Sequence, residues 1–149
     1  MRFTFDTNIL VYAIDAKAGQ RHSMAVEFVD RAKNGECILA LQSLGEFFSV
    51  AIRKIGLDPK EAEEIVDDWR STFPVIAADE DCLADAMWAV RQHRLSFWDA
   101  MLWAAAKGAG CRLLISEDFD DGQAIGPVTF VDPFQDHNAV LLGAALPAL

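Results

Sequence analysis

Short apolar runs that alternate with longer helical stretches constrain the fold of this chain more than any other feature. Cys37–Leu41 (CILAL) is a continuous apolar run, which is typical of a strand covered on both faces. Runs of this kind, separated by helices of about 10–15 residues, favour parallel strands joined by helical crossovers. The sequence therefore predicts an α/β fold with one short, mainly parallel sheet built from five runs: Arg2–Phe5, Cys37–Leu41, Pro74–Ala77, Arg112–Ile115 and Val128–Val131.

The stretches between these runs carry helical signals. Met24, Phe28 and Ala32 recur at helical spacing, and Asn34-Gly35 then provides a C-terminal stop. The Gly- and Asp-rich stretch Asp118–Gly126 is expected to be a loop. We predict helices over six segments: Asn8–Ile14, His22–Lys33, Ser43–Ile55, Asp58–Ser71, Asp79–Arg94 and Ser96–Lys107.

The charge balance and the cysteine content narrow the class of protein. The 149 residues include 23 acidic and 13 basic ones, a formal net charge of −10, so the chain has no strongly basic coat for non-specific nucleic-acid binding. Its 3 cysteines lack CxxC spacing, which indicates neither a disulfide framework nor a zinc knuckle and fits a reducing cytoplasm. No run of about 18 apolar residues is present. We expect one acidic, cytoplasmic domain without a membrane span.

Acidic residues lie close to the ends of several predicted strands. Asp6 comes directly after the first strand, and Asp118 follows the fourth within Ser116-Glu117-Asp118. Glu46 lies in the first turn of the helix after the second strand, and Asp99 begins the apolar helix before the fourth. Ligands of open parallel sheets bind beyond the carboxyl ends of the strands. We therefore expect these four side chains to gather along one edge of the sheet.

Such a group of carboxylates predicts a metal site. Crowded carboxylates repel each other, and a low-dielectric cleft raises their pKa values unless a cation neutralises them. Mg²⁺ and Mn²⁺ prefer oxygen ligands and need few protein carboxylates plus water. The grouping therefore predicts one or two metal ions and phosphoryl-transfer chemistry.

Each acid also has a purely structural alternative. Ser43-Leu44-Gly45-Glu46 and Ser96-Phe97-Trp98-Asp99 both match the capping box, in which the acid bonds the N-cap amide. Asp6 is equally suited to cap a helix, and Asp118 to an ordinary turn. Each acid taken singly is compatible with a structural role or with metal binding, and the set of four together favours the metal site.

The order and spacing of four acidic segments resemble those of PIN-domain ribonucleases: FDTNIL from Phe5, SLGEF from Ser43, SFWDA from Ser96 and LLISED from Leu113. The resemblance spans residues 1–134, and in length and plan it is greatest to VapC-type toxins of bacterial toxin–antitoxin pairs. It implies a three-layer α/β sandwich and a Mg²⁺-dependent endoribonuclease, often a homodimer, that leaves 5′-phosphate and 3′-hydroxyl ends. It also implies a cognate antitoxin, which we expect to cover the acidic cleft and to place an arginine among the carboxylates.

Under this resemblance, Asp6, Glu46, Asp99 and Asp118 form the acidic quartet. Asp6, Asp99 and Asp118 are the expected ligands of Mg²⁺ or Mn²⁺, while Glu46 binds through water or positions the nucleophile. Asp118, Asp120 and Asp121 compete for the fourth place, with Asp118 ranked first and Asp121 second. Asp121 is otherwise expected to support the site. Three further side chains are expected to orient the carboxylates or the scissile phosphate by hydrogen bonding: Thr7, Asn8 and Ser116.

Basic and aromatic side chains complete the expectations. Candidates for holding the RNA backbone, each also typical of a solvated helix face or an ion pair, are Arg21, Arg53, Lys54, Arg91 and Arg94. Large apolar side chains at helical spacing, for which we expect core packing rather than base stacking, are Trp88, Trp98, Trp103, Met87 and Met101.

Two other functions stay open. A haloacid-dehalogenase-like phosphatase also places an aspartate after the first strand, but it needs a second aspartate where this chain has Asn8. A non-catalytic PIN-like binding module needs the fold without the convergence of four acids. We divide the chain into a PIN-like domain at residues 1–134 and an apolar tail at residues 135–149, which could pack on the body, support a dimer or belong to an antitoxin groove.

Overall fold

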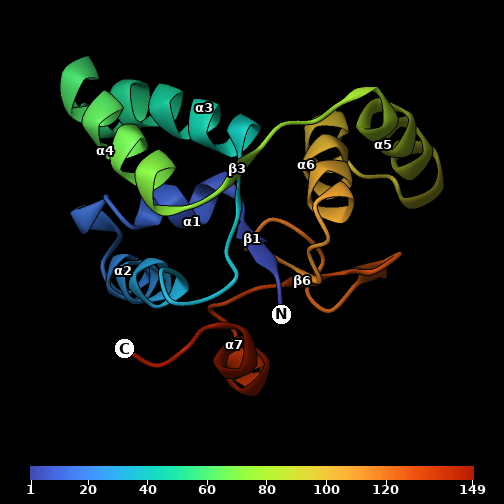
Figure 1. The fold of residues 1–149 in the computed structure, drawn as a ribbon. Helices are drawn as coiled ribbons and strands as arrows, with labels where there is room; N and C mark the ends of the chain where they lie inside the picture. The colour runs from blue at the N-terminus through green and yellow to red at the C-terminus, as the bar shows by residue number, and fades with distance from the viewer.

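The central sheet positions everything else in the molecule. The computed structural model describes residues 1–149 (Figure 1). β1, β4 and β6 are parallel, with Phe3 opposite Leu113 and Leu113 opposite Thr129, while β5 runs antiparallel to β6. The predicted mainly parallel sheet flanked by helices is confirmed. The strands, in their order across the sheet, are β1 (Phe3–Phe5), β4 (Leu113–Ile115), β6 (Val128–Val131) and β5 (Ala124–Ile125).

Two of the predicted strands leave this sheet and pair with each other in parallel: β2 (Leu39–Ala40) and β3 (Val75–Ile76). Ile38 N donates to Phe3 O at 3.0 Å, whereas Leu39 N donates to Pro74 O at 2.9 Å. The chain thus changes its pairing partner from β1 to the segment of β3 within one residue. The expectation of a single five-stranded sheet is therefore wrong.

The stretch expected to be a loop, residues 118–126, contains the edge strand β5. Gly122 N donates to Phe130 O at 2.8 Å, and Phe130 N donates to Gln123 O at 2.9 Å. Gly126, with a φ of 56°, makes the turn into β6. The composition of this segment did not indicate a strand. A short hairpin is stabilised by backbone hydrogen bonds and by its turn, and polar residues and glycines are compatible with both.

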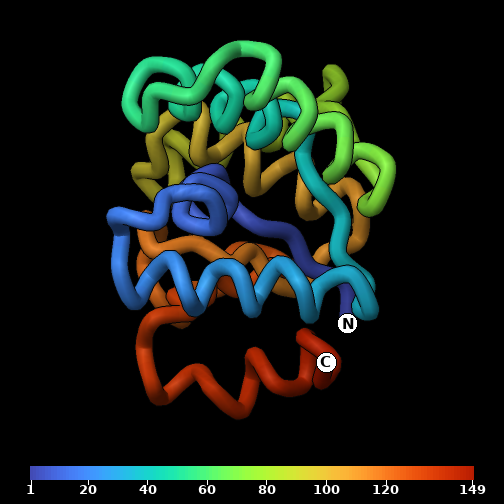
Figure 2. Tube along the Cα trace, turned by 90° about the vertical axis from the view of Figure 1, so that its left-hand side faces the viewer, coloured from blue at the N-terminus to red at the C-terminus, as the bar shows by residue number.

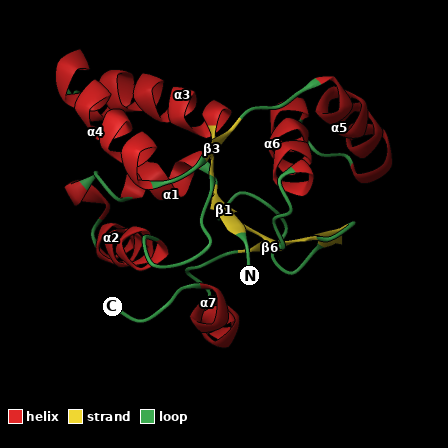
Figure 3. Cartoon of the chain, viewed as in Figure 1, coloured by secondary structure: helices red, strands yellow, loops and turns green.

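Seven α-helices surround the strands, and their arrangement is clear in Figures 1 and 3. They are α1 (Thr7–Tyr12), α2 (Gln20–Ala32), α3 (Leu41–Val50), α4 (Pro59–Thr72), α5 (Glu80–His93), α6 (Phe97–Gly108) and α7 (Ala139–Ala145). Three short helical turns lie between them: η1 (Ala16–Ala18), the π-helical η2 (Ala51–Ile55) and η3 (Asp136–Asn138).

The sheet separates two hydrophobic cores. Leu113 and Ile115 of β4 belong to the core formed with α1, α2 and α7, while Leu114 between them belongs to the core formed with α5 and α6. This is the two-residue period of a strand whose two faces are both covered. Three layers result, as expected.

The start of α3 differs from the prediction. α3 begins at Leu41, directly after β2, with Ala40 at the N-cap position and no side-chain cap. Ser43 therefore lies inside the helix, and its hydroxyl is buried without a hydrogen-bond partner. The capping-box interpretation of Ser43 and Glu46 is wrong, because the strand runs into the helix two residues earlier. At α6 the Ser96 hydroxyl does act as the cap and accepts from the N–H of Asp99 at 3.3 Å.

Core packing of the large apolar side chains holds only in part. Trp103 is 1% exposed, and its indole N–H donates to Ile125 O at 3.1 Å. Met87, Trp88 and Trp98 are 53%, 41% and 61% exposed, so the expectation of core packing is wrong for these three. Trp98 lies in the first turn of α6, where Ala100 is buried but the indole of Trp98 is exposed.

The C-terminal tail packs on the body of the molecule. Leu142, Ala145 and Leu146 are buried in the same core as α2, and Figure 2 shows α7 lying alongside α2. Arg31 of α2 donates through Nη2 to Leu146 O at 2.6 Å and through Nε to Pro147 O at 3.0 Å. No helix in the structure has the length and apolar character needed to cross a membrane.

Candidate active site

The four predicted acids meet in one cleft at the carboxyl ends of β1 and β4, which we call the acid cleft. It has a volume of about 510 Å³ and is lined by Asp6, Glu46, Asp99 and Asp118. These residues come from the β1–α1 junction, α3, α6 and the loop after β4. The other lining residues include one acid, Asp15, and one base, Lys54. The remainder are Thr7, Asn8, Val11, Tyr12, Val50 and Ile55.

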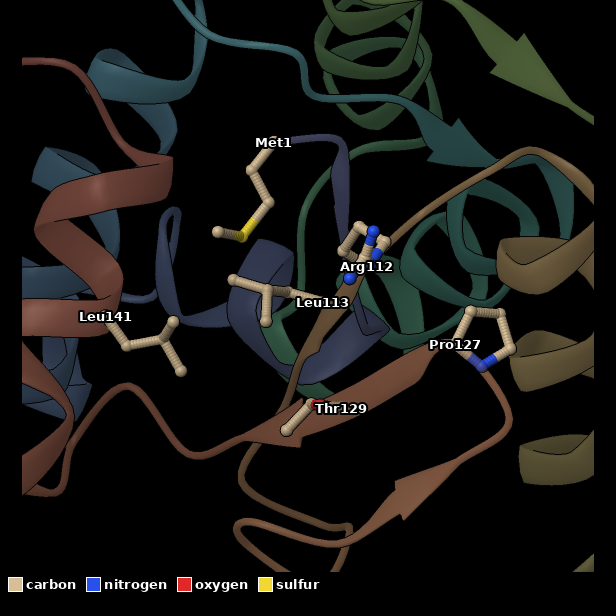
Figure 4. Close-up of a pocket in the computed structure, with 6 residues that line it drawn as sticks. All are labelled: Met1, Arg112, Leu113, Pro127, Thr129 and Leu141. Carbon is tan, nitrogen blue, oxygen red and sulfur yellow. The ribbon is translucent and has the colours of Figure 1, made fainter.

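A second cavity, of about 430 Å³, lies between the N-terminus, β4, β6 and α7 (Figure 4). Arg112 is the only charged side chain on its wall, and Met1, Leu113, Pro127 and Leu141 contribute apolar surface. None of the four acids reaches it. The chemistry expected from the sequence therefore belongs to the acid cleft.

Asp6 is the most deeply buried of the four acids, with 7% of its surface exposed. Its N–H donates to Ile115 O at 2.9 Å, which extends the β1–β4 ladder into the site. Its carboxylate accepts from the Thr7 N–H and from the Ser116 hydroxyl, both at 2.7 Å. Asp6 therefore caps α1, as the structural alternative proposed, and lines the acid cleft as well.

Asp6 and Asp99 hold their protons more tightly than ordinary aspartates. Burial raises the pKa of Asp6 to about 6; hydrogen bonds oppose this shift, and the charges of Asp99 and Asp118 add to it. Burial also raises the pKa of Asp99, and the charges of Asp118 and Glu46 add to it. The acid cleft thus has more negative charge than its own hydrogen-bond donors compensate.

The Asn8 amide lies between two of the acids. Its Nδ2 donates to Asp118 Oδ2 at 2.9 Å, to Ser116 Oγ at 3.1 Å and to Asp6 Oδ2 at 3.4 Å. Its Oδ1 is buried without a partner. The amide supplies partial positive charge at the place where the Asp6 and Asp118 carboxylates approach each other. Asn8 and Ser116 thus occupy the supporting positions expected from the sequence.

Glu46 is held from two sides. Its Oε2 accepts from the Thr7 hydroxyl at 2.9 Å, and its Oε1 accepts from Gln42 Nε2 at 3.2 Å. Gln42 also donates to Trp98 O at 3.0 Å, which ties α3 to the first turn of α6 next to Asp99. Sequence reasoning missed Gln42, although its spacing of four residues from Glu46 on a helix was an available signal.

Asp121, the second choice for the fourth acid, does not line the acid cleft. Its carboxylate accepts from the Asp132 N–H at 2.9 Å, from Asn138 Nδ2 at 2.8 Å and from His137 Nε2 at 2.7 Å. These bonds tie the loop after β4 to the segment that leads into α7. The expectation of Asp121 as a supporting residue of the site is not met, because its oxygens are engaged elsewhere. Asp118 occupies the place in the cleft.

Of the five basic candidates, only Lys54 lines the acid cleft. Arg53 donates to Ser49 Oγ at 3.0 Å. Arg91 and Arg94 are exposed near the end of α5, where Arg94 has a φ of 57°. Arg21 lies at the start of α2 and forms an ion pair with Glu117 at 2.9 Å. Sequence reasoning missed Glu117 and Tyr12, which contact each other beside the cleft.

The acid cleft suits a hard divalent cation by its donor chemistry. The candidate ligands are carboxylate oxygens, which Mg²⁺ prefers, and a cation relieves the repulsion among them. Although the four acids line one cleft, no three acids, cysteines or histidines lie close enough together to form a ready-made ligand set. Mg²⁺ usually takes one or two carboxylates and keeps several waters, so such a set is not required.

A family model places the chain among known domains. The model of the PIN domain matches residues 3–123, a span that contains all four acids of the cleft. The chain belongs to the PIN domain family. This confirms the resemblance carried by the four acidic segments. Among the curated proteins, none matches the chain.

Solved structures share the fold of this PIN domain. A toxin–antitoxin complex from Klebsiella pneumoniae is 24% identical with a TM-score of 0.64, covering 89% of this chain and 98% of that chain. VapC20 from Mycobacterium tuberculosis, described as a Sarcin-Ricin loop cleaving toxin, is 21% identical with a TM-score of 0.63, covering 79% and 89%. DNA-bound VapBC from Salmonella typhimurium is 16% identical with a TM-score of 0.65, covering 89% and 98%. At these identities the likeness establishes the fold.

Proposed function

We propose that this PIN domain is a metal-dependent endoribonuclease and the toxin of a toxin–antitoxin pair. The observation that carries the proposal is the convergence of Asp6, Glu46, Asp99 and Asp118 in one cleft at the carboxyl ends of parallel strands. Burial and mutual repulsion raise the pKa values of Asp6 and Asp99. A metal-dependent phosphodiesterase needs such uncompensated carboxylates, whereas packing alone does not.

Mg²⁺, or Mn²⁺ in its place, is the proposed cofactor, with Asp6, Asp99 and Asp118 as its ligands. A bound ion of this kind polarises a phosphate oxygen and lowers the pKa of coordinated water. With a pKa of about 6, Asp6 keeps a protonated fraction near neutral pH. A neighbouring cation favours its ionised form, so metal binding and loss of this proton are linked.

The chain's own side chains orient the reaction, an in-line attack of water on phosphorus with departure of the 3′-oxygen. Glu46 positions the attacking water, because Thr7 and Gln42 fix both of its oxygens. The Ser116 hydroxyl and the Asn8 amide keep the metal-binding acids aligned. The expected products carry 5′-phosphate and 3′-hydroxyl ends.

The proposed partners are an RNA substrate, an antitoxin and a second copy of this chain. Structural neighbours are named as a toxin that cleaves the Sarcin-Ricin loop and as toxin–antitoxin assemblies. An antitoxin arginine suits the acid cleft, because a guanidinium pairs bidentately with carboxylates in place of a metal. Exposed apolar side chains such as Met87 (53%) and Trp98 (61%) support a homodimer.

The other candidate functions receive less support from the site. A haloacid-dehalogenase-like phosphatase needs a second aspartate where Asn8 donates to Asp6 and Asp118. A non-catalytic binding module does not require four acids in one cleft. Trapping of a phospho-aspartate would favour the phosphatase over the nuclease.

Incubation of the purified chain with RNA tests the proposal. We expect cleavage with Mg²⁺ or Mn²⁺, none in EDTA, and 5′-phosphate ends at the new termini. Thermal unfolding provides a second readout, since an ion that binds only the native form at 100 times its dissociation constant stabilises it by about 2.7 kcal/mol. Absence of both cleavage and metal stabilisation contradicts the proposal. Co-expression with the neighbouring open reading frame, followed by co-purification, tests the antitoxin.

A further inference from the structure

A polar and aromatic cluster lies at the rim of the acid cleft and has no part in the proposed chemistry; we call it the Arg21 cluster. Tyr12 Oη donates to Glu117 Oε1, and Arg21 Nε donates to Glu117 Oε2 at 2.9 Å. The ring of Phe134 packs edge-on against Tyr12 at 5.6 Å, and its centroid lies 4.9 Å from the guanidinium carbon of Arg21. Tyr12 lines the acid cleft and Glu117 directly precedes Asp118, so the two sites share a wall.

We infer that the Arg21 cluster is a phosphate-binding subsite that holds one backbone phosphate of the RNA beside the acid cleft. The inference rests on the proposed function, because it assigns a position for the same substrate. Among the basic residues near the site, Arg21 is chosen because Glu117 and Phe134 orient its guanidinium while its two Nη atoms stay free to bind a phosphate.

Arg21 is oriented but not saturated. The bond to Glu117 and the contact with Phe134 fix the plane of the guanidinium. The two Nη atoms of Arg21 make no hydrogen bond within the protein, and the side chain is 50% exposed. A guanidinium edge matches two oxygens of a phosphate bidentately. Because the side chain is already ordered, less conformational entropy is lost when a phosphate binds.

The acid of the cluster does not repel an incoming phosphate as a free carboxylate would. The Glu117 side chain is 19% exposed, and its two oxygens accept from Tyr12 and Arg21. Burial, followed by the hydrogen bond to Glu117, raises the pKa of Tyr12 to about 12, so the phenol keeps its proton near neutral pH. Glu117 therefore acts as a positioning residue for Arg21.

The place of Arg21 in its helix argues against a purely structural role. Arg21 lies in the first turn of α2, which has no acidic residue and no side-chain cap. A cation there opposes the helix dipole and does not stabilise the helix. The chain carries a net charge of −10, and Lys54 is the only base that lines the acid cleft itself. Few basic side chains near the site can therefore bind an RNA phosphate, and Arg21 is one of them.

The salt dependence of RNA binding tests the subsite. A fluorescein-labelled, unpaired RNA of 12 nucleotides is titrated with Asp99→Asn protein, silenced for cleavage, in Mg²⁺ over a series of KCl concentrations. In this background Arg21→Gln is expected to weaken binding about tenfold at low salt and to reduce the slope of log K against log [KCl] by about 0.7. Arg70→Gln is the matched control, since Arg70 is 60% exposed and pairs with one carboxylate, Asp67, at 3.1 Å. It should leave both quantities unchanged.

Arg21→Lys separates charge from geometry and guards against a variant that does not fold. It should keep the salt slope but bind about fivefold more weakly, because an ammonium cannot bind a phosphate bidentately. Single methylphosphonate linkages along an oligonucleotide that the unmodified protein cleaves then locate the contact. One position should raise KM for the unmodified protein but not for Arg21→Gln, with little change in kcat.

Three results would overturn the subsite. They are equal effects of Arg21→Gln and Arg70→Gln, no detectable RNA binding, and no methylphosphonate position that raises KM for the unmodified protein alone. Cleavage with no dependence on Arg21 overturns the subsite and leaves the nuclease standing. Binding that depends on Arg21 without any cleavage supports the subsite and overturns the proposed nuclease. The two failures are therefore distinguishable.

Discussion

Asp118 and Asp121 lie three residues apart on one loop, yet their surroundings are opposite. Asp121 accepts from the Asp132 N–H, Asn138 and His137, between 2.7 and 2.9 Å. Burial acts to raise its pKa, but these donors outweigh burial and leave the pKa lowered. Asp118 accepts from the Asn8 amide, which also lies near Asp6, and it faces other acids across the cleft.

The contrast distinguishes a carboxylate with a structural role from carboxylates whose pKa values are raised by burial and neighbouring charge. Around Asp121 three donors serve one carboxylate, and their hydrogen bonds hold the tail against the loop. Around Asp6 and Asp99, burial and the charges of neighbouring acids outweigh the hydrogen bonds and raise the pKa values of both residues. A cation from outside the chain, either a metal ion or a partner's side chain, would compensate this negative charge.

The largest expected effect is on RNA cleavage. Asp6→Asn or Asp99→Asn should reduce cleavage by about 1000-fold or more, since the proposed metal would contribute several kcal/mol of charge stabilisation. Asp121→Asn should stay within about twofold of the unmodified chain when corrected for folded protein. Initial rates on one RNA, with contaminating nuclease excluded, provide the measurement. Full activity in Asp99→Asn would defeat the assignment of the acid cleft.

The second prediction concerns stability against pH without metal. The folded-state pKa of Asp6 is raised from 3.8 to about 6, so the native form binds this proton more tightly than the unfolded form. The stabilisation is therefore present below about pH 4 and is lost as the pH rises through 6, by about 3 kcal/mol at most. Urea unfolding from pH 4 to 7 should show the unmodified chain losing stability relative to Asp6→Asn as the pH rises, because Asn does not titrate. A constant difference contradicts the raised pKa.

The third prediction concerns the hydrogen bonds that Asp121 accepts from Asp132, His137 and Asn138. Asp121→Ala leaves several donors unpaired and should destabilise the fold by about 1–3 kcal/mol. Because the pKa of Asp121 is lowered, its contribution is present above the ordinary aspartate pKa and is lost as the pH falls through the folded-state value. Chemical denaturation at neutral and acidic pH measures both statements. An unchanged unfolding midpoint at neutral pH would show that the bonds to the tail contribute nothing.

The smallest effect applies the same contrast to two serines. Ser96 caps α6 through the Asp99 N–H, so Ser96→Ala should cost about 0.5–2 kcal/mol. Ser43 is buried with no partner for its hydroxyl, so Ser43→Ala should be neutral or slightly stabilising. Thermal unfolding of the two variants side by side checks this. The reverse order would restore the capping box at Ser43.

Much of the fold and the place of the acids could be predicted from order along the chain. Asp6 and Ser116 each follow a strand directly, and parallel strands end at the same edge, so their proximity follows from topology. The alternation of apolar runs and helices likewise predicted the positions of β1, β2, β3, β4 and β6 and of α1 to α6, but it missed β5 and α7. These are properties of neighbouring residues and of the chain's direction, which a sequence displays.

The roles of individual side chains could not be predicted, because they depend on partners far away in the sequence. Asp118 and Asp121 stand in similar local sequence and differ through Asn8 on one side and His137 on the other. Arg21 is bound by Glu117, 96 residues away. Trp98 is 61% exposed, although its apolar neighbours along the chain suggested a core position. Burial and donor supply are properties of the assembled molecule.

The pairing of the first strand with β4 sets the order in which the site can form. Ser116 donates to Asp6 across 110 residues of chain. Contacts of such long range form late in folding, because a large loop must close before they stabilise anything. While the chain is being synthesised, Asp6 exists from the start but has neither β4 beside β1 nor Asp118 opposite it. A nascent chain therefore carries separate acids, and the acid cleft is completed only when most of the protein has been made.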